Sequence, residues 1–222
     1  MTQHKQSSPQ GFDQAQEFYE KNRNLIIGGG VVVLLVIAFF VYRAVQKNQQ
    51  EKEAAPMMAM PQNYFAQDSF RLALYGDGLN AGFLQIIDDY GRSSSANLAR
   101  FYAGVSFLQV GDAGQAIEYL EDYGTSSDMR EARRLEVLGH AYAESGDMEK
   151  AAGKYEQAAD AIDNGFFTPY YLMTAADAQV YLGNYENALK LYERIKNDYP
   201  NSTEAQSIEK FISYARIKAG KS

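Results

Sequence analysis

The sequence predicts an all-α protein in which a single N-terminal transmembrane helix precedes a solenoid of helical repeats with a C-terminal capping helix. Three observations lead to this fold class. They are an uncharged apolar run from Leu25 to Tyr42, a helix–turn–helix pattern with a period of roughly 35 residues, and an amphipathic segment after the last repeat. A period of this length is typical of repeat arrays, in which each unit buries its apolar face against its neighbours.

The apolar run has the length that a membrane-spanning helix needs. Its 18 residues make a helix of ~27 Å, close to the ~30 Å hydrocarbon core of a bilayer. No charge appears before Arg43, whereas a helix buried in a soluble core usually keeps a polar face. We therefore expect a transmembrane anchor over residues 25–45.

The residues before the run indicate an anchor that is not cleaved. A cleavable signal peptide has a short charged region and a small-residue cleavage site behind its apolar stretch. Here a polar segment, residues 1–24, comes first, and no such site follows the run. The aromatic residues between Phe12 and Asn22 predict an interfacial helix within this segment.

Three consecutive glycines, Gly28, Gly29 and Gly30, lie near the start of the run. Glycine is common in membrane helices because it allows backbones to approach closely. Two interpretations fit: simple tolerance of glycine near a helix end, or a membrane contact face for another protein. The spacing is not the G-x-x-x-G pattern of helix dimers.

Charge restricts the partners but leaves the orientation open. Lys21 and Arg23 precede the run, and Arg43, Lys47 and Lys52 follow it, so the positive-inside rule favours neither direction clearly. Residues 46–222 carry 17 Lys and Arg against 25 Asp and Glu, which argues against binding to nucleic acid or to an anionic membrane surface. The chain has no cysteine, which excludes a disulfide framework, a cysteine zinc site and a lipid-bearing cysteine.

A linker and three similar units follow the anchor. Residues 46–62 are of mixed composition, and their two prolines should end any helix that leaves the membrane. The units lie at 96–130, 131–166 and 167–200. In each of them an apolar helix face is followed by a glycine-led turn and a second helix that carries an alanine.

The turns and the alanines fix the register of these units. The turns are Val110-Gly111-Asp112, Ser145-Gly146-Asp147 and Leu182-Gly183-Asn184, and the alanines are Ala116, Ala151 and Ala188. Units of this period with small residues at the helix crossings and aromatic residues between them are typical of tetratricopeptide repeats. Each glycine supplies the positive φ that so short a reversal needs. We expect the small residues of the first helices, Gly104 and Gly139, to let the paired helices cross closely.

A degenerate repeat at 63–95 precedes the three units. Its apolar helices are predicted at Tyr64 to Tyr75 and at Gly82 to Tyr90, around a glycine-rich loop. With it, the predicted repeat domain covers residues 63–222.

A capping helix at 201–219 completes the domain. Asn201 is expected to cap it, with Glu204 reaching back to the cap. A terminal helix that covers the last repeat and turns a polar face outward is what such arrays need.

The sequence contains no catalytic motif. It has no nucleophile elbow, phosphate loop or paired-acid motif, so we expect no enzyme activity, no cofactor and no metal site. Of the two histidines, His4 lies in the polar N-terminal segment, and His140 lies four residues from Glu136 and Glu144. A histidine and a carboxylate at this spacing can hold a metal or shuttle protons, but the pair is far more often a surface pair on a helix.

Partner-binding residues are predicted on the first helices of the units, which line the concave face of such an array. In two units one helix stripe provides Arg133, Glu136 and His140, and then Tyr170, Met173 and Asp177. The equivalent stripe of the preceding unit is apolar and consists of Leu98, Phe101, Val105 and Leu108. Either the degenerate repeat or the linker covers this stripe, or it is a groove for an extended or helical apolar segment.

Three arginines, Arg130, Arg133 and Arg134, gather at the start of one of these helices. They form a clamp for a carboxylate, or they are helix-surface arginines that face Glu131 and Glu136. Their spacing fits both interpretations.

The order of the parts is itself informative. A polar segment from Phe18 to Asn24 precedes the glycine-bearing anchor, and a short linker and the repeats follow. In this order of parts the protein resembles the bacterial YfgM family. The resemblance covers nearly the whole chain from about Phe12. The stretch from Leu74 to Tyr90 is similar to the region behind that family's linker.

The resemblance implies an inner-membrane protein with its N-terminus in the cytoplasm and its repeats in the periplasm. Members of the family are ancillary subunits of the Sec translocon. They associate with a membrane-anchored periplasmic chaperone of the prolyl-isomerase type and with secreted client chains. The residues alone leave open an alternative, a cytoplasm-facing receptor or regulator that binds a soluble partner's peptide segment at a membrane.

Overall fold

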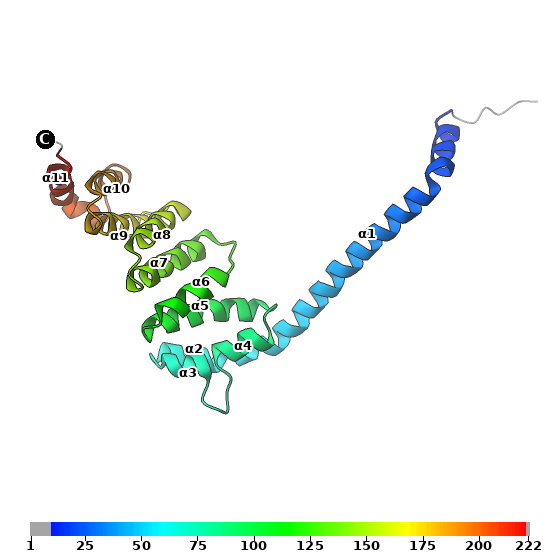
Figure 1. Ribbon diagram of the computed structural model, residues 1–222, viewed down its shortest axis with the longest axis horizontal. Helices are drawn as coiled ribbons and strands as arrows, with labels where there is room; N and C mark the ends of the chain where they lie inside the picture. Colours follow the sequence, from blue (N-terminus) through cyan, green and yellow to red (C-terminus); the bar gives the residue numbers. More distant parts are fainter. Residues whose placement is uncertain (1–9, 221–222) are drawn as a thin grey trace, which may run out of the picture. The chain divides into compact units, whose positions relative to one another are not determined.

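The computed structural model describes the backbone of residues 10–220 and the side chains of residues 17–220. Over that range there are eleven α-helices, one 3₁₀ helix and no strand (Figure 1), so the all-α prediction is confirmed. The chain divides into two compact units, Met1–Gln49 and Gln50–Ser222. His4 lies outside the described residues.

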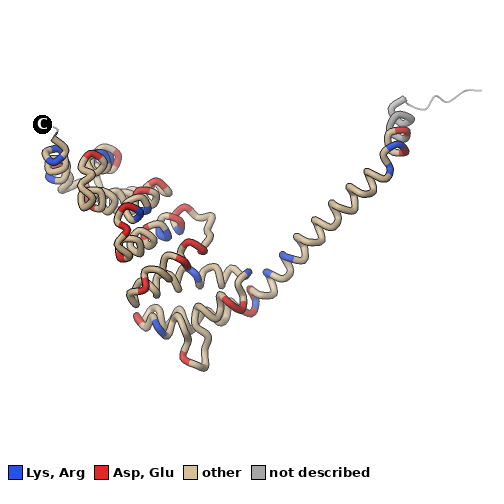
Figure 2. The backbone as a smooth tube through the Cα atoms, viewed as in Figure 1, with Lys and Arg blue, Asp and Glu red and all other residues tan. Residues whose placement is uncertain are grey.

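The described residues of the first unit form one helix, α1 (Gln10–Met57), whose last residues belong to the second unit. Figure 2 shows its middle part without any charged residue. It is the one helix within the described range that is long and apolar enough to cross a membrane. Side chains such as Leu34 and Phe40 are well exposed along it, which is costly in water and favourable in lipid.

The N-terminal end of α1 contains the helix predicted between Phe12 and Asn22. Residues 10–24 and the apolar run form one continuous helix, because no proline or capping break interrupts the chain before Leu25. The location of this end at a membrane interface stays a prediction. A Cβ atom built on Gly28, Gly29 or Gly30 would meet nothing within 4 Å. The contact of these glycines with a membrane partner therefore stays a prediction.

The expected linker at 46–62 is also helical. Residues 46–57 continue α1, which ends one residue after Pro56, and α2 (Ala59–Ala66) follows with Pro61 in its first turn. Pro56 thus lies at the end of α1, as predicted. The prediction for Pro61 is wrong, because it lies in the first turn of α2, where proline is tolerated, and ends no helix. The residues around both prolines are helical because Ala54 and Met58 are buried in the core of the second unit.

The end of α1 also caps α5 (Ser94–Gln109). The carboxylate of Glu51 accepts hydrogen bonds from the backbone N–H of Ser95 at 2.9 Å and from its hydroxyl at 2.8 Å. The side chain of Gln50 accepts another from the backbone N–H of Arg92 at 3.1 Å. The first N–H groups of a helix need acceptors and attract negative charge, so residues 50–58 form part of the repeat unit.

The degenerate repeat consists of α2, α3 (Phe70–Tyr75) and α4 (Phe83–Asp89). The single helix predicted from Tyr64 to Tyr75 is wrong, because a turn at residues 67–69 separates α2 from α3 and Asp68 has a φ of 54°. Aspartate and serine favour such turns, since their side chains compete for backbone hydrogen bonds.

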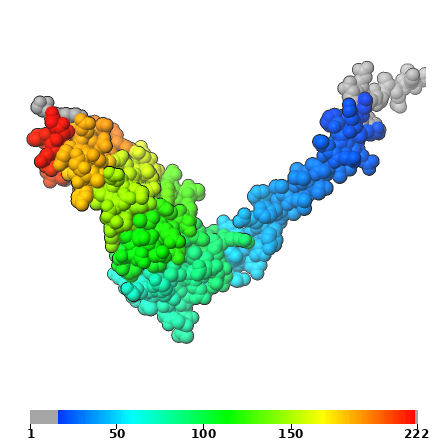
Figure 3. All heavy atoms as spheres, in the orientation of Figure 1, coloured from blue at the N-terminus to red at the C-terminus, as the bar shows by residue number. Residues whose placement is uncertain are grey.

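The three regular units are pairs of helices. They are α5 with α6 (Ala113–Asp122), α7 (Asp128–Glu144) with α8 (Met148–Ala161), and α9 (Phe167–Tyr181) with α10 (Tyr185–Asp198). From α4 onward each helix packs on the next one in the chain, so the colours of this unit follow one another in sequence order in Figure 3.

The three predicted turns have the same geometry. Gly111, Gly146 and Gly183 have φ values of 82°, 88° and 77°. Each glycine N–H bonds to the carbonyl three residues back, and the next residue bonds to the carbonyl five residues back, which is the Schellman motif. In two turns that next residue also caps the following helix, because Asp112 and Asp147 accept from the N–H groups of Gln115 and Lys150.

Small residues lie where paired helices cross, as predicted. A Cβ atom on Gly104 would lie about 2.5 Å from Leu120 Cγ, and one on Gly139 would lie within 3 Å of three carbon atoms of the Tyr155 ring. These distances are far below van der Waals contact. The α5–α6 and α7–α8 pairs therefore require glycine at these positions.

The array ends in η1 (Glu204–Ser207) and α11 (Ile208–Lys218). Ile208, Ile212 and Ala215 are buried in one cluster with Tyr192 of α10, so the predicted capping helix is confirmed. The predicted cap is wrong. The hydroxyl of Ser202, not the side chain of Asn201, accepts the N–H of Ala205 at 3.1 Å.

Replacing Gly139 by alanine tests the helix crossing. We expect Gly139→Ala to lower the free energy of unfolding by roughly 1–3 kcal/mol, the usual cost of overpacking a core, in urea titrations followed by circular dichroism. The matched control is Gly153→Ala in α8, where a Cβ atom meets nothing within 4 Å. It should raise stability by up to about 1 kcal/mol, because alanine is the better helix former. Equal stability of the two variants would contradict the crossing geometry.

Candidate functional site

A pocket of about 580 Å³ lies between the N-terminal halves of α7 and α9, with η1 at its edge. Ligand pockets in proteins span about 300–1,000 Å³, so its size suits a ligand or a few side chains of a partner. All of its lining residues belong to the second unit.

One wall of the pocket is a stripe of α7 with Met129, Arg130, Arg133 and Glu136. Residues three, four and seven positions apart lie on the same face of a helix. The other side of α7 buries Ala132, Leu135 and Leu138, and the side chains of Met129, Arg130 and Arg133 are exposed.

The facing wall is aromatic and comes from the start of α9. Phe166, Phe167, Tyr170 and Tyr171 line it, and the rings of Phe166 and Phe167 meet edge to face at 5.0 Å between centroids. Asn164 orients this segment, because its side-chain oxygen accepts the N–H groups of Phe166 at 2.9 Å and Phe167 at 3.0 Å. The hydroxyl of Thr168 accepts the N–H of Asn164 and donates to the carbonyl of Ile162.

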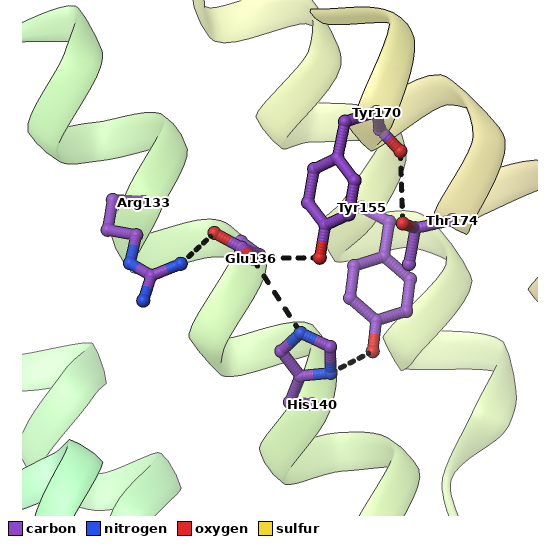
Figure 4. A network of polar contacts seen from close by, with 6 residues as sticks. All are labelled: Arg133, Glu136, His140, Tyr155, Tyr170 and Thr174. Carbon is purple, nitrogen blue, oxygen red and sulfur yellow. Dashed lines mark hydrogen bonds and ion pairs between the residues drawn. The ribbon is translucent and has the colours of Figure 1, made fainter. Parts of the chain in front are cut away.

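A buried carboxylate connects the two walls (Figure 4). Glu136 is 4% exposed and accepts hydrogen bonds from Arg133 Nη1 at 2.6 Å and from the Tyr170 hydroxyl at 3.2 Å. His140 Nε2 lies 3.8 Å from it, and His140 Nδ1 lies 3.0 Å from the Tyr155 hydroxyl of α8. The network thus joins α7, α8 and α9, which belong to two successive repeats.

The partners of Glu136 keep it ionised. Burial by itself would raise the pKa of the Glu136 carboxyl, but the donors and charges of His140 and Arg133 outweigh burial, and its pKa is lowered. Burial raises the pKa of the Tyr155 hydroxyl to about 12, with help from nearby Tyr170 and Glu136. The Tyr170 pKa is raised by burial and by the Glu136 carboxylate. These groups form a charged hydrogen-bonded brace at neutral pH.

The arrangement resembles a support for the pocket more than a reaction centre. Glu136 and His140 are both occupied by neighbouring side chains. Within residues 17–220 no three His, Asp or Glu side chains come together as a metal site would require.

The structure brings together part of the predicted partner-binding set. Arg133, Glu136 and Tyr170 line the pocket, and His140 adjoins it through Glu136. Met173 packs against the core around Tyr192 and Leu172. Asp177 is exposed and accepts a hydrogen bond from the Tyr192 hydroxyl at 2.8 Å. Neither Met173 nor Asp177 lines this pocket.

The apolar stripe of α5 is largely covered. Phe101, Val105 and Leu108 pack against a cluster formed by Leu120, Val137 and Leu138, and Leu98 packs against the core that contains Ala54 and Phe83. Most of this cover comes from α6 and α7, not from the degenerate repeat or the linker as expected. Of the four side chains, Leu98 and Leu108 pack against the core to which the degenerate repeat and the predicted linker contribute. All four side chains are half-buried, and their binding of an apolar segment stays a prediction.

Several residues that line the pocket are not among those predicted from the sequence. Met129 lies one residue before the noted arginine cluster, Phe166 directly precedes α9, and Phe167 is the first residue of α9. The signal that points to the two phenylalanines is an apolar pair beside Gly165, where polar residues are usual. Glu204, which the sequence assigns to a cap, lines the pocket instead.

Comparison with known protein families identifies the repeats. Residues 135–166 and 170–202 match the tetratricopeptide repeat, and they cover most of α7–α8 and α9–α10. No curated protein matches the chain. The two matches indicate a tetratricopeptide-repeat protein and confirm the predicted fold class. Repeats of this kind are scaffolds for protein–protein interaction, and here the pocket lies between the two matched units.

Replacing Glu136 by glutamine tests the brace. At neutral pH we expect Glu136→Gln to lower the free energy of unfolding by about 1–3 kcal/mol, the range for hydrogen bonds to charged groups. The lowered pKa of Glu136, compared with its usual 4.5, means that this stabilisation is complete above about pH 4.5 and is lost as the pH falls through the folded-state pKa. Urea titrations of both proteins should therefore converge at low pH.

The control for this prediction is Glu209→Gln. It breaks an exposed ion pair with Lys196, and exposed pairs contribute little to stability. A pH-independent difference between the wild type and Glu136→Gln would show that the carboxylate charge is not what stabilises the site.

Proposed function

We propose that this chain is a membrane-anchored interaction scaffold that binds segments of other proteins in the pocket between α7 and α9. One observation carries the proposal. Four aromatic residues and two arginines line an open pocket at the junction of two tetratricopeptide repeats. Aromatic residues and arginine are the types that most often carry binding energy at protein interfaces.

The second part of the proposal concerns place and partners. The resemblance to the YfgM family supports a bacterial inner-membrane protein with a cytoplasmic N-terminus and periplasmic repeats. In this role it acts as an ancillary subunit of the Sec translocon, and it scaffolds a periplasmic chaperone of the prolyl-isomerase type, emerging secreted chains, or both. Helix α1 supports the anchoring, because it is long and apolar enough to span a bilayer.

A second candidate is a cytoplasm-facing receptor or regulator that binds a soluble partner's peptide segment. The basic residues do not decide between the two candidates. Arg43, Lys47 and Lys52 follow the apolar run and Lys21 and Arg23 precede it, so the positive-inside rule favours neither direction. Topology separates the two candidates.

Thiol labelling measures that topology. Single cysteines are introduced by Ser7→Cys in the N-terminal segment and by Ser126→Cys in the exposed loop before α7 of this cysteine-free chain. Intact cells are then treated with a membrane-impermeant thiol reagent. We expect labelling of Ser126→Cys alone, because the proposal puts the repeats outside the cytoplasm.

Lysed cells provide the control, since both cysteines should then react. Labelling of Ser7→Cys alone in intact cells would rule out the translocon-accessory role and leave the cytoplasm-facing receptor. Labelling of both in intact cells would show that the chain does not span the membrane once.

A further inference from the structure

We propose that the pocket between α7 and α9 recognises an extended polypeptide segment in which a large apolar side chain lies next to a carboxylate. This inference rests on the proposed scaffold function and specifies the chemistry of its ligand. The two walls of the pocket carry the two halves of the argument.

The aromatic wall defines the apolar half of the ligand. Phe166 is 75% exposed, and Phe167 and Tyr170 are also partly open to solvent. An aromatic side chain buries about 150–250 Å² when it is covered, so an apolar partner residue gains much contact here. The conformation of the aromatic wall is already set by the hydrogen bonds of Asn164 and Thr168. A preformed surface loses little entropy on binding.

The α7 wall defines the charged half. Arg130 is exposed, and within residues 17–220 its side chain has no hydrogen bond or ion pair. Arg133 donates to Glu136 through Nη1, but its side chain remains 58% exposed. A guanidinium group presents several donors in a flat fork that matches a carboxylate. Two cationic groups next to an aromatic surface thus suit a ligand with an acidic group.

The acidic residues of the pocket do not cancel this preference. Glu136 is buried and already accepts from Arg133 and Tyr170, so its charge is balanced within the wall. Glu204 of η1 also lines the pocket. It would repel a ligand carboxylate near it, so the acid must lie toward the arginines of α7.

The net charge of the chain, −7, opposes acidic ligands at long range. Such repulsion is screened beyond about 8 Å at physiological ionic strength, whereas Arg130 and Arg133 act at contact distance. Recognition of an acid by this protein therefore depends on these two side chains. That dependence makes the proposal testable by single substitutions.

The experiment uses three fluorescein-labelled peptides of ten residues. The first has adjacent phenylalanine, leucine and two aspartates in a glycine–serine background; the second has lysines in place of the aspartates, and the third has serines in place of the apolar pair. Binding to the full chain in lipid nanodiscs is measured by fluorescence anisotropy. We expect the first peptide to bind at least about tenfold more tightly than either of the others.

Two variants, each with a matched control, assign the binding to the pocket. Arg130→Glu should weaken binding of the first peptide at least about tenfold and strengthen binding of the lysine peptide. Arg71→Glu, at an exposed position of α3, should change the binding of neither peptide. Phe166→Ser should weaken binding of the first peptide at least about fivefold. Ile217→Ser, which alters a side chain of α11 that is 76% exposed, should bind the first peptide with an affinity within about twofold of the wild type. Thermal unfolding by circular dichroism verifies that all four variants fold.

Three results would overturn the inference: equal binding of all peptides, no binding of any peptide up to millimolar concentration, or unchanged binding by folded Arg130→Glu and Phe166→Ser. The scaffold function is tested separately, by co-purification of translocon and chaperone subunits with the full chain from membranes. If these subunits co-purify while the peptides fail, only the ligand chemistry is wrong. If the first peptide binds as expected and no subunit co-purifies, the proposed translocon and chaperone partners are wrong. The proposed ligand chemistry of the pocket is then still supported.

Discussion

Reversal of the chain within a few residues is the constraint on which the repeat unit depends. Gly111, Gly146 and Gly183 each take a left-handed backbone conformation, and each closes a Schellman motif. The residue that follows completes the C-terminus of one helix, and in two turns its carboxylate also caps the next helix. Because so short a turn leaves paired helices close together, glycine is also required at the crossings, at Gly104 and Gly139.

The pocket is a consequence of stacking such pairs. The start of α9 lies opposite the start of α7, and two phenylalanines, the last residue before α9 and its first residue, lie there in place of polar residues. The same stacking puts Glu136 of one repeat against Tyr170 of the next. A buried carboxylate is tolerated only when it is well paired, and Arg133, Tyr170 and His140 provide that pairing. The brace therefore holds both walls of the pocket at neutral pH.

Residues 50–58, which span the end of α1, belong to the repeat unit and are not a free linker. Residues 50–58 supply acceptors for the N-terminus of α5 and two buried apolar side chains, Ala54 and Met58. The degenerate repeat would otherwise be an end unit with an uncovered apolar face, which repeat arrays must cap. The C-terminal end is covered in an analogous way by α11.

The sequence by itself determined the features that depend on short separations along the chain. These are the uncharged run of α1, the glycine-led turns, the close crossings at Gly104 and Gly139, and the apolar face of α11, and each follows from a few residues at helical spacing. Tertiary structure decided the rest. Glu51 caps α5 from 44 positions away, and the pocket joins Arg130, Phe166 and Glu204 from three different segments. Such contacts depend on how helices stack, and local periodicity carries no information on which side chains then face one another.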